Sequence, residues 1–519
     1  MKKIFFILTV IIGLSACTDL STKLYDRIPY DQFPENDAQA GLLMIPIYQP
    51  LQQFLDWGGW WFAQEITADA VVCPTRAQDW DDGGKWRALY LHEWDATNND
   101  LEAVNSMWYW FNKGVTEANR VIDMVKEAAD NGQEAALKTM AEAKTMRAFY
   151  YWLLIDNYGD VPFISSFFNA PENPVPNYRA EIWQQIVNDL EESLPYLSTD
   201  DNKYQATKWM AYMLLSKLYL NAKVYTGNED VEYYNKVVAY CDSVITSGKF
   251  SLESDPLAPF VTNNENSPEN IFTIGYDEDT YKGFNLHMRT LHYLNQYTYD
   301  MPVMPWNGFA AVEDFYNKFS SSDKRKKMFL VGQQYTSTGD SLFDDDAGGA
   351  PLSFDPYIPQ LKMDYSTNTA VEIRMSGARV VKFEVKLGAT DNLSNDFPIF
   401  RYADAIMMQG EAMLRGATVA GTQYPTSDAA INAIRSRAGL TPLAGASLDD
   451  YLDELGREFY WEAHRRQDLI RFGHFGDPKW EYAGDGTEDK TVFPIPKWAI
   501  EANPNLANAP VSIEGSNNN

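Results

Sequence analysis

Aromatic rings and carboxylates alternate in the segment Pro74 to Trp86, which reads PTRAQDWDDGGKW. It holds two tryptophans, three aspartates and two cations beside a proline and a pair of glycines, and neither a helical nor a strand period runs through it. Sugar rings present C–H groups that pack against aromatic faces, while their hydroxyls bind carboxylates, amides and guanidinium groups. The composition of this segment therefore predicts a loop that binds a sugar.

Trp80 and Trp86 are the rings of this loop that we expect to stack on a sugar. A hydrophobic core is hard to build from a segment that holds proline, paired glycine and several charges. Which ring contacts the sugar stays open, and the other ring would then anchor the loop. The expected polar partners of the sugar are Asp69, Arg76 and Asp79. Arg76 has an alternative role, in which it pairs with Asp79 or Asp81 and stiffens the loop.

Tryptophan is concentrated around this loop, since eight of the 15 lie between Trp57 and Trp110. Trp108 and Trp110 stand among apolar residues on a helical stretch and are expected in the core. The run WGGWW, Trp57 to Trp61, supports two interpretations. Its glycines let the chain approach a ligand, or they make a tight turn beneath a buried tryptophan.

A second candidate for ligand binding is Trp306, in the segment MPWNGFAA. Pro305 fixes the direction of the chain and Gly308 permits a sharp turn, so we expect the ring at an exposed turn. Asn307 is its expected polar companion. Arg374, in the loop before GARVVKFE, is a further candidate guanidinium donor.

Metal and cofactor sites have little support in the sequence. The acids of DWDDGG begin at Asp79, but the twelfth position from it is Tyr90 and not the glutamate that an EF-hand requires. The acidic segment Asp340 to Gly349 would hold a structural calcium ion only weakly and is better explained as a solvated loop. We therefore predict no metal ligand and no cofactor.

Glu458 and Glu462 are the paired carboxylates that a glycoside hydrolase would need. They lie one helical turn apart, and arginines stand near them. Two acids on one helix face among arginines more often form salt bridges than a catalytic pair. The GxSxG motif of serine hydrolases is absent from the sequence. We therefore expect no enzymatic activity.

The first residues predict the compartment. Lys2 and Lys3 precede the apolar run Ile4 to Leu14, which suits a signal peptide and is too short to span a bilayer. The following LSAC ends at Cys17 and resembles the lipobox of bacterial lipoproteins, in which the cysteine becomes the lipidated first residue. We expect a protein anchored by lipid to a membrane, and the alternative is secretion after a cut near Ala16.

The net charge of −29 limits the ligand. An acidic surface repels nucleic acid and anionic polysaccharides, and it favours a neutral or cationic ligand. Cys73 and Cys241 are the cysteines that remain after lipidation, and two unpaired, buried thiols are favoured over a disulfide.

Helical patterns dominate both ends of the chain. Apolar residues recur every three or four positions, and the short polar connections between these stretches are typical of stacked helical hairpins. The expected helices include Met140–Leu154, Ile182–Leu197, Met210–Leu218, Ala403–Leu414, Ala429–Arg437 and Tyr451–Arg466. AYMLLSKLYL has the spacing of tetratricopeptide helices, although no strict repeat of about 34 residues is visible. The predicted fold class is mostly α.

The middle of the chain has a different texture. Between residues 251 and 398, the β-prone runs Asn270–Tyr276 and Arg379–Val385 stand among long polar loops that carry aromatic residues. Long loops in a compact protein are typically functional. We predict a signal peptide at 1–16, an N-terminal helical region at 17–250 with an aromatic loop at 57–95, and a C-terminal region at 251–519, which comprises a loop-rich ligand insert at 251–398 and helices at 399–519.

Several motifs follow the order that one protein family shows. The C-terminal third contains NDFPIFRYADAIMMQGEAMLRG, INAIRSRAGL, ELGREFYWEAHRRQDLIRFG and PIPKWAIEANPNL, and the N-terminal half contains EANRVID and AEAKTMRAFYYWLLIDNYGDVPF. Over nearly the whole chain after the signal peptide, they resemble the SusD/RagB family of outer-membrane nutrient-binding lipoproteins of Bacteroidetes. The tail departs from the family, because NPNLANAPVSIEG replaces the usual NPNLxQNPGY.

This resemblance implies a SusD-like scaffold of four tetratricopeptide-like hairpins with an irregular, loop-built ligand face. It implies a non-catalytic protein on the cell surface that captures oligosaccharide and passes it to a SusC-like TonB-dependent transporter of the outer membrane. It also places ligand-binding aromatics in the middle region, which supports Trp306. Peptide capture by the same fold and a secreted glycoside hydrolase remain the alternatives.

Overall fold

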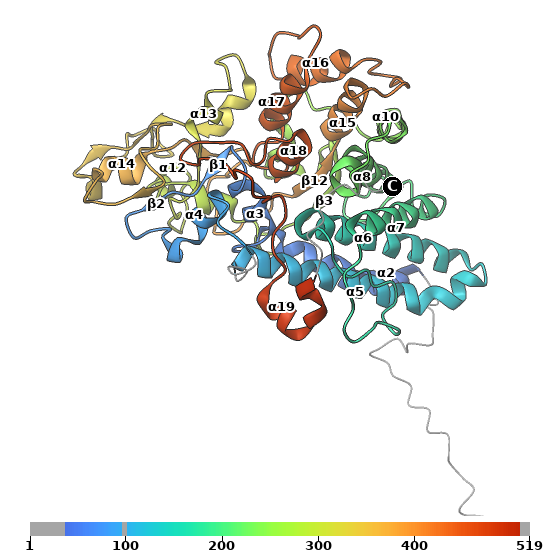
Figure 1. Ribbon diagram of the computed structural model, residues 1–519. Helices are drawn as coiled ribbons and strands as arrows, with labels where there is room; N and C mark the ends of the chain where they lie inside the picture. Colours follow the sequence, from blue (N-terminus) through green and yellow to red (C-terminus); the bar gives the residue numbers. More distant parts are fainter. Residues whose placement is uncertain (1–36, 96–100, 509–519) are drawn as a thin grey trace, which may run out of the picture.

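The computed structural model describes residues 37–95 and 101–508. Cys17 and the leader before it lie outside these residues. Figure 1 shows blue-to-green helices stacked on one side of the protein and the loop-rich yellow and orange segments on the other. No helix in the described ranges is both long and apolar enough to cross a membrane.

Helices make up most of the regular structure, and the strands are short and paired. The α-helices are α2 (Asp37–Tyr48), α3 (Trp60–Ile66), α4 (Lys85–Tyr90), α5 (Glu102–Asp130), α6 (Glu134–Tyr158), α7 (Arg179–Ser193), α8 (Lys208–Leu220), α9 (Ala222–Thr226), α10 (Val231–Ile245), α11 (Leu286–Thr290), α12 (Asn295–Thr298), α13 (Glu313–Tyr316), α14 (Ala370–Met375), α15 (Tyr402–Leu414), α16 (Ser427–Arg437), α17 (Leu448–Glu458), α18 (Arg465–Phe472) and α19 (Lys497–Ala502). The strands are β1 (Val71–Val72), β2 (Thr75–Arg76), β3 (Asn270–Ile274), β4 (Ala310–Ala311), β5 (Phe329–Leu330), β6 (Gly332–Gln333), β7 (Phe343–Asp344), β8 (Ala350–Pro351), β9 (Ser353–Phe354), β10 (Lys362–Met363), β11 (Arg379–Val380) and β12 (Phe397–Arg401).

Neighbouring helices pack in pairs. The longest pair is α5 with α6, and Gly114 of α5 is needed there because a Cβ atom at this position would collide with the ring of Tyr150 on α6. The packing continues from α6 to α7, from α8 to α10, from α10 to α15 and from α15 to α16. This succession confirms the mostly α fold that the apolar periodicity predicted.

One predicted helix is wrong. Tyr451–Arg466 is not continuous, because α17 ends at Glu458 and α18 begins at Arg465. Trp461 and Ala463, between them, have φ of 69° and 63°, a left-handed conformation that interrupts a right-handed helix. The interruption lets the Trp461 ring pack against Trp61, with 4.6 Å between ring centroids.

The two β-prone runs have different outcomes. Asn270–Tyr276 forms β3, which pairs antiparallel with β12 as part of the core. Arg379–Val385 is a strand only over its first two residues, which form β11 against β5. After β11 the chain turns so that the Lys382 ammonium contacts Glu462 at 2.5 Å.

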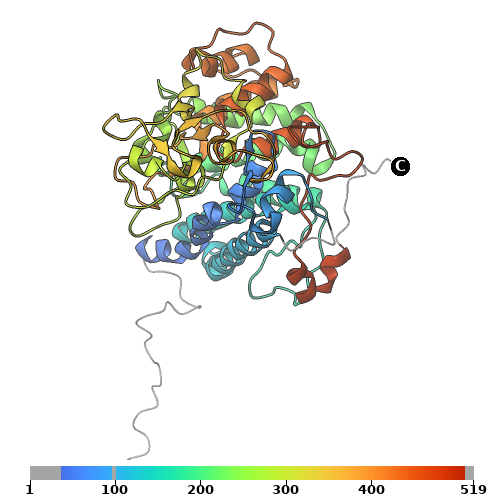
Figure 2. The same cartoon turned by 90° about the vertical axis from the view of Figure 1, so that its left-hand side faces the viewer.

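Two small sheets join the predicted aromatic loop, 57–95, to the predicted ligand insert, 251–398. Strand β1 pairs antiparallel with β4, and β2 runs parallel to β10. Figure 2, in which the loop-rich side faces the viewer, shows the yellow segments gathered on this side. The pairing brings segments that are far apart in sequence side by side.

Candidate functional site

Trp80 and Trp86 are buried, with 7% and 1% of their surface exposed. Trp86 on α4 stacks on Phe62 of α3 with 5.0 Å between centroids, and Trp80 meets Phe309 edge to face at 5.3 Å. We expected one ring to face a sugar and the other to anchor the loop, but both are buried and neither presents an exposed face. A core forms despite the local charges because α3 and the segment 305–309, remote in sequence, supply the apolar partners.

Trp57 and Trp306 form the outer layer of the same group of rings and are both partly exposed. The Trp57 ring lies 5.4 Å from those of Trp80 and Trp86 and 6.0 Å from that of Trp306. We call these four tryptophans the aromatic cluster. In the run WGGWW, Gly58 has a φ of 67° and the glycines form a turn that leads into the buried Trp60 and Trp61, so the tight-turn interpretation fits the structure.

The segment that carries Trp306 is held against Trp80. The Trp80 indole Nε1 donates to the carbonyl oxygen of Trp306 at 2.7 Å. A Cβ atom on Gly308 would collide with the Trp80 ring, so only glycine permits this close approach. Asn307, between Trp306 and Gly308, has a φ of 52°, a left-handed conformation. The expected exposed turn at Trp306 is wrong, because residues 304–309 form neither a turn nor a bend, and the ring is half-buried.

Tyr293 connects two of the predicted polar residues, and the sequence interpretation missed it. Its hydroxyl donates to the Asp79 carboxylate, and the Arg374 guanidinium lies over its ring at 4.9 Å from the centroid. Burial, and then the hydrogen bond and charge of Asp79, raise the pKa of Tyr293, so the hydroxyl stays protonated. The aromatic run HYLNQYTY, just before the Trp306 segment, is the signal that could have identified it.

Arg374 lies on helix α14 and not in the predicted loop, and it is partly buried and paired. Its Nε contacts the Asp344 carboxylate at 2.5 Å, and its Nη2 contacts Asp346 at 3.1 Å. Although burial opposes ionisation, hydrogen bonds from His292 and Arg374 hold the pKa of Asp344 below its ordinary value. Arg374 is thus fixed in orientation beside Tyr293.

Arg76 faces the protein interior instead of the surface. Its Nη1 donates to the carbonyl oxygen of Ile373 at 2.8 Å and its Nη2 to that of Ser376 at 2.9 Å. Asn307 is also fully buried. The expectation that these two side chains are available to sugar hydroxyls is wrong. The alternative, that Arg76 stiffens the loop, fits the contacts, although backbone carbonyls replace Asp79 and Asp81 as its side-chain partners.

Asp69 makes its contacts elsewhere. Its carboxylate binds Arg465 through two hydrogen bonds of 2.7 and 2.8 Å. Both residues line a cavity of about 310 Å³ beside α17 and α18. Burial would raise the pKa of Asp69, but the charge of Arg465 lowers it. The structure does not bring Asp69 together with the aromatic cluster.

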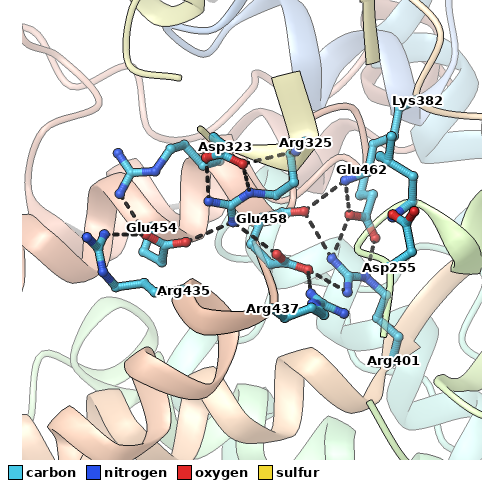
Figure 3. Close-up of polar contacts among 12 residues, drawn as sticks. Asp255, Asp323, Arg325, Lys382, Arg401, Arg435, Arg437, Glu454, Glu458 and Glu462 are labelled. Atoms are coloured by element: carbon cyan, nitrogen blue, oxygen red, sulfur yellow. Dashed lines mark hydrogen bonds and ion pairs between the residues drawn. The ribbon is translucent and has the colours of Figure 1, made fainter. Parts of the chain in front are cut away.

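Glu458 and Glu462 belong to a buried network of ion pairs (Figure 3). Glu458 binds Arg325 at 3.0 Å and Arg401 at 2.9 Å. Glu462 binds Arg401 at 2.7 Å and Lys382 at 2.5 Å. Burial opposes ionisation of Glu458, but the surrounding guanidinium groups hold its pKa well below the ordinary value. The salt-bridge interpretation is confirmed for both carboxylates, but Glu462 follows the end of α17 and does not share a helix face with Glu458, and their partners come from other segments of the chain.

Over residues 37–95 and 101–508, no group of three or more His, Cys, Asp and Glu side chains could hold a metal ion. Cys73 and Cys241 are buried free thiols, as expected. Burial raises the pKa of both thiols, that of Cys241 to about 12.

Charged groups of both signs border the aromatic cluster. Asp79 and Asp82 are exposed, and the Lys85 ammonium lies 5.2 Å from the centroid of the Trp57 ring. Partly exposed rings beside such groups can stack on a flat, apolar face and bind hydroxyls at its edge. The arrangement suits non-covalent recognition of a ring-shaped polar ligand.

Two family models match the chain. One, described as the SusD family, matches residues 253–511, and the other, described as starch-binding associating with outer membrane, matches residues 60–220. The starch-binding protein SusD of Bacteroides thetaiotaomicron is 26% identical over 457 residues, which cover 77% of each chain. The SusD-like protein P25 of Formosa agariphila is 23% identical over 454 residues, 80% of each chain.

Solved structures share the fold. A SusD superfamily protein of Parabacteroides distasonis superposes with a TM-score of 0.72 at 20% identity, covering 90% of this chain and 98% of that one. Surface glycan-binding protein A of Bacteroides thetaiotaomicron, in complex with laminarihexaose, superposes with a TM-score of 0.70 at 20% identity, covering 91% and 98%. At this identity the similarity establishes the architecture.

Proposed function

Because this chain belongs to the SusD family of glycan-binding proteins, we propose that it captures a neutral oligosaccharide at the aromatic cluster. The observation that supports this proposal most directly is the partial exposure of the two outer rings of that cluster. Trp57 and Trp306 are partly exposed and rest on the buried rings of Trp80 and Trp86. A rigid base keeps the outer rings in place, so little side-chain freedom is lost when a sugar stacks on them.

Glucans are the first ligands to test. One relative is a starch-binding protein, and a structural neighbour was solved with laminarihexaose. The acidic rim residues Asp79 and Asp82, together with the overall charge of −29, disfavour uronic-acid and sulfated chains. A neutral glucan oligosaccharide agrees with both the rings and the charge.

The wider role follows from the family. We assign the protein to the outer membrane, anchored at Cys17 and facing outward, where it delivers the glycan to a SusC-like TonB-dependent transporter. The name of the matching family model, which mentions association with the outer membrane, supports this location. The pairing of Glu458 and Glu462 within the buried network supports a role in binding without catalysis.

Isothermal titration calorimetry with starch-derived oligosaccharides and laminarihexaose tests the proposal. Trp57→Ala and Trp306→Ala should each lose about 1–3 kcal/mol of binding free energy, the value of a stacked aromatic ring. Trp498→Ala is the control, because Trp498 is exposed on α19. If no neutral glycan binds the wild type, or if both site variants keep its affinity, the proposed site is wrong.

Peptide capture is the alternative that the acidic rim favours. A basic peptide would be attracted by Asp79 and Asp82, and this attraction weakens as salt screens the charges. Stacking on a neutral sugar responds little to ionic strength. Titrations at about 0.05 and 0.5 M salt separate the two ligands, since the Debye length falls roughly threefold over that range.

A further inference from the structure

Arg76, on β2, joins the segment that carries Trp306 to the end of helix α14, which carries Arg374. Its Nε and Nη2 lie 3.4 Å from the carbonyl oxygen of Gly308. Its Nη1 donates to the carbonyl oxygen of Ile373, on α14, and its Nη2 to that of Ser376, just after α14. A single guanidinium therefore bridges segments 305–309 and 373–379.

Arg379, on β11, makes a second connection between the segments 305–309 and 373–379. Its Nη1 donates to the carbonyl oxygens of Ser376 at 2.7 Å and Gly377 at 2.5 Å. Its Nη2 donates to the Asn307 amide oxygen at 2.8 Å and to the Arg374 carbonyl at 3.1 Å. The Asn307 amide nitrogen donates to the same Arg374 carbonyl at 3.0 Å. The next residue after Trp306 is thereby tied to the backbone of Arg374.

Neither arginine pairs with a carboxylate among the residues that the structure describes. Arg76 and Arg379 are both buried, and their side-chain hydrogen bonds go to backbone carbonyls and to the Asn307 amide. Burial lowers the pKa of both guanidinium groups. The last carbonyls of a helix have no intrahelical partner, and these two side chains supply donors to the carbonyls of Ile373 and Arg374 at the end of α14.

We infer that Arg76, Arg379 and Asn307 are positioning residues that hold the segment of Trp306 and the end of α14, with Arg374, in their binding geometry before a ligand arrives. The inference rests on the proposed function of the aromatic cluster. A planar guanidinium offers donors in several directions and so reaches two segments at once, which the single ammonium of lysine does not do. Segments that are already ordered lose less entropy on binding.

Arg379→Lys and Arg76→Lys test the inference, because both keep the positive charge and remove the planar guanidinium with its several N–H donors. Each should weaken binding of laminarihexaose, or of whichever glucan binds the wild type, on the order of tenfold. Asn307→Gly keeps the left-handed conformation, removes the amide and should act in the same direction. Arg466→Lys is the matched control. Arg466 is equally buried and donates to the Thr491 carbonyl at 2.6 Å. Its hydrogen bond lies outside the segments 305–309 and 373–379.

A second measurement separates positioning from loss of stability. The protein is labelled with 5-fluorotryptophan, and the ¹⁹F line of Trp306 is identified by its absence in Trp306→Phe. We expect this line to shift or broaden in Arg379→Lys and Arg76→Lys, and to remain unchanged in Arg466→Lys, at temperatures where circular dichroism shows each variant folded.

The outcomes distinguish the two proposals. If Trp57→Ala and Trp306→Ala lose the glucan while Arg379→Lys and Arg76→Lys bind it like the wild type, the positioning role is wrong and the proposed function stands. If the wild type binds no glucan, the proposed function fails. The ¹⁹F line of Trp306 then decides the positioning role by itself, and an unchanged line in both lysine variants would reject it.

Discussion

The four tryptophans of the aromatic cluster have different roles because their exposure differs. The sequence interpretation chose Trp80 and Trp86 from the acidic loop, yet these rings are the buried base. Trp57 and Trp306 are the partly exposed rings that a ligand can reach. Local charge density was a poor guide to exposure because the apolar partners of the loop come from distant segments.

Trp86→Ala should affect stability more than any direct contact with a ligand. Its ring is enclosed by Phe62, Trp57 and Trp80, and deleting it leaves a cavity that costs about 3–5 kcal/mol of unfolding free energy. Guanidinium denaturation measures the loss, with the more exposed Trp57→Ala as the comparison. A Trp86→Ala protein of wild-type stability that no longer binds glucan would show that this ring touches the ligand.

At the scale of elements, helix periodicity was reliable and helix continuity was not. The apolar repeat identified α7 and α15 closely, whereas the break between α17 and α18 was missed. The break depends on Trp461, which packs against Trp61, and on Ala463, whose backbone N–H donates to Glu65 at 2.6 Å. These partners, Trp61 and Glu65, lie near the N-terminal end of the described chain. The local sequence around Trp461 therefore does not predict the break.

Ala463→Gly should leave the protein as stable as the wild type or about 0.5–1 kcal/mol more stable. Ala463 has a φ of 63°, which glycine adopts without the steric cost that a Cβ atom carries. The control is Ala128→Gly within α5, which should lose about 1 kcal/mol because glycine weakens a helix interior. Urea denaturation compares the two. An equal loss of unfolding free energy in both variants would contradict the proposed relief of backbone strain at Ala463.

At the scale of the whole molecule, the buried ion-pair network joins distant parts of the chain. Arg401 at the end of β12 contacts Glu269 before β3, Glu458 on α17 and Glu462 in the turn after it. Figure 3 shows Arg401, Glu458 and Glu462 converging with Arg325 from the loop-rich region. The network therefore couples the C-terminal helices to the loop-rich middle of the chain.

Glu458→Gln should lower the unfolding free energy by about 3–5 kcal/mol, because it leaves buried guanidinium groups without their counter-charge. Glu192→Gln, on the surface and paired with Lys144 at 2.9 Å, should change it by less than about 1 kcal/mol. Chemical denaturation measures both. Release of product from a polysaccharide by the wild type, abolished in Glu458→Gln, would instead revive the hydrolase alternative.

The pH dependence of stability should carry a signature of Glu65. Burial raises its pKa from 4.5 to about 8 in the folded protein. Between these values the folded state binds the extra proton, so the contribution of this group to stability falls as pH rises from about 4.5 to 8. Glu65→Gln removes that contribution. The unfolding free energy plotted against pH should have different slopes for the wild type and Glu65→Gln. Parallel curves for the two proteins would contradict the raised pKa of Glu65.

The amino-acid sequence by itself determined most of the helices and the order of the family motifs, and it supplied the ligand chemistry that we propose. Helix periodicity and residue composition are local properties. Of the site residues that the sequence predicted, Asp79 is exposed, and Trp306 and Arg374 are partly exposed. The helices could be predicted because they depend on neighbouring residues in the chain.

Tertiary structure alone decided which side chains face the ligand and which support them. It buried Trp80 and Trp86, exposed Trp57 in part, and directed Arg76 and Asn307 inward to bind backbone carbonyls. Exposure is the result of packing among segments that are hundreds of residues apart, as the Trp80 contact with the Trp306 carbonyl shows. A ring or a guanidinium has the same local chemistry in either position, so only the fold separates a ligand contact from its support.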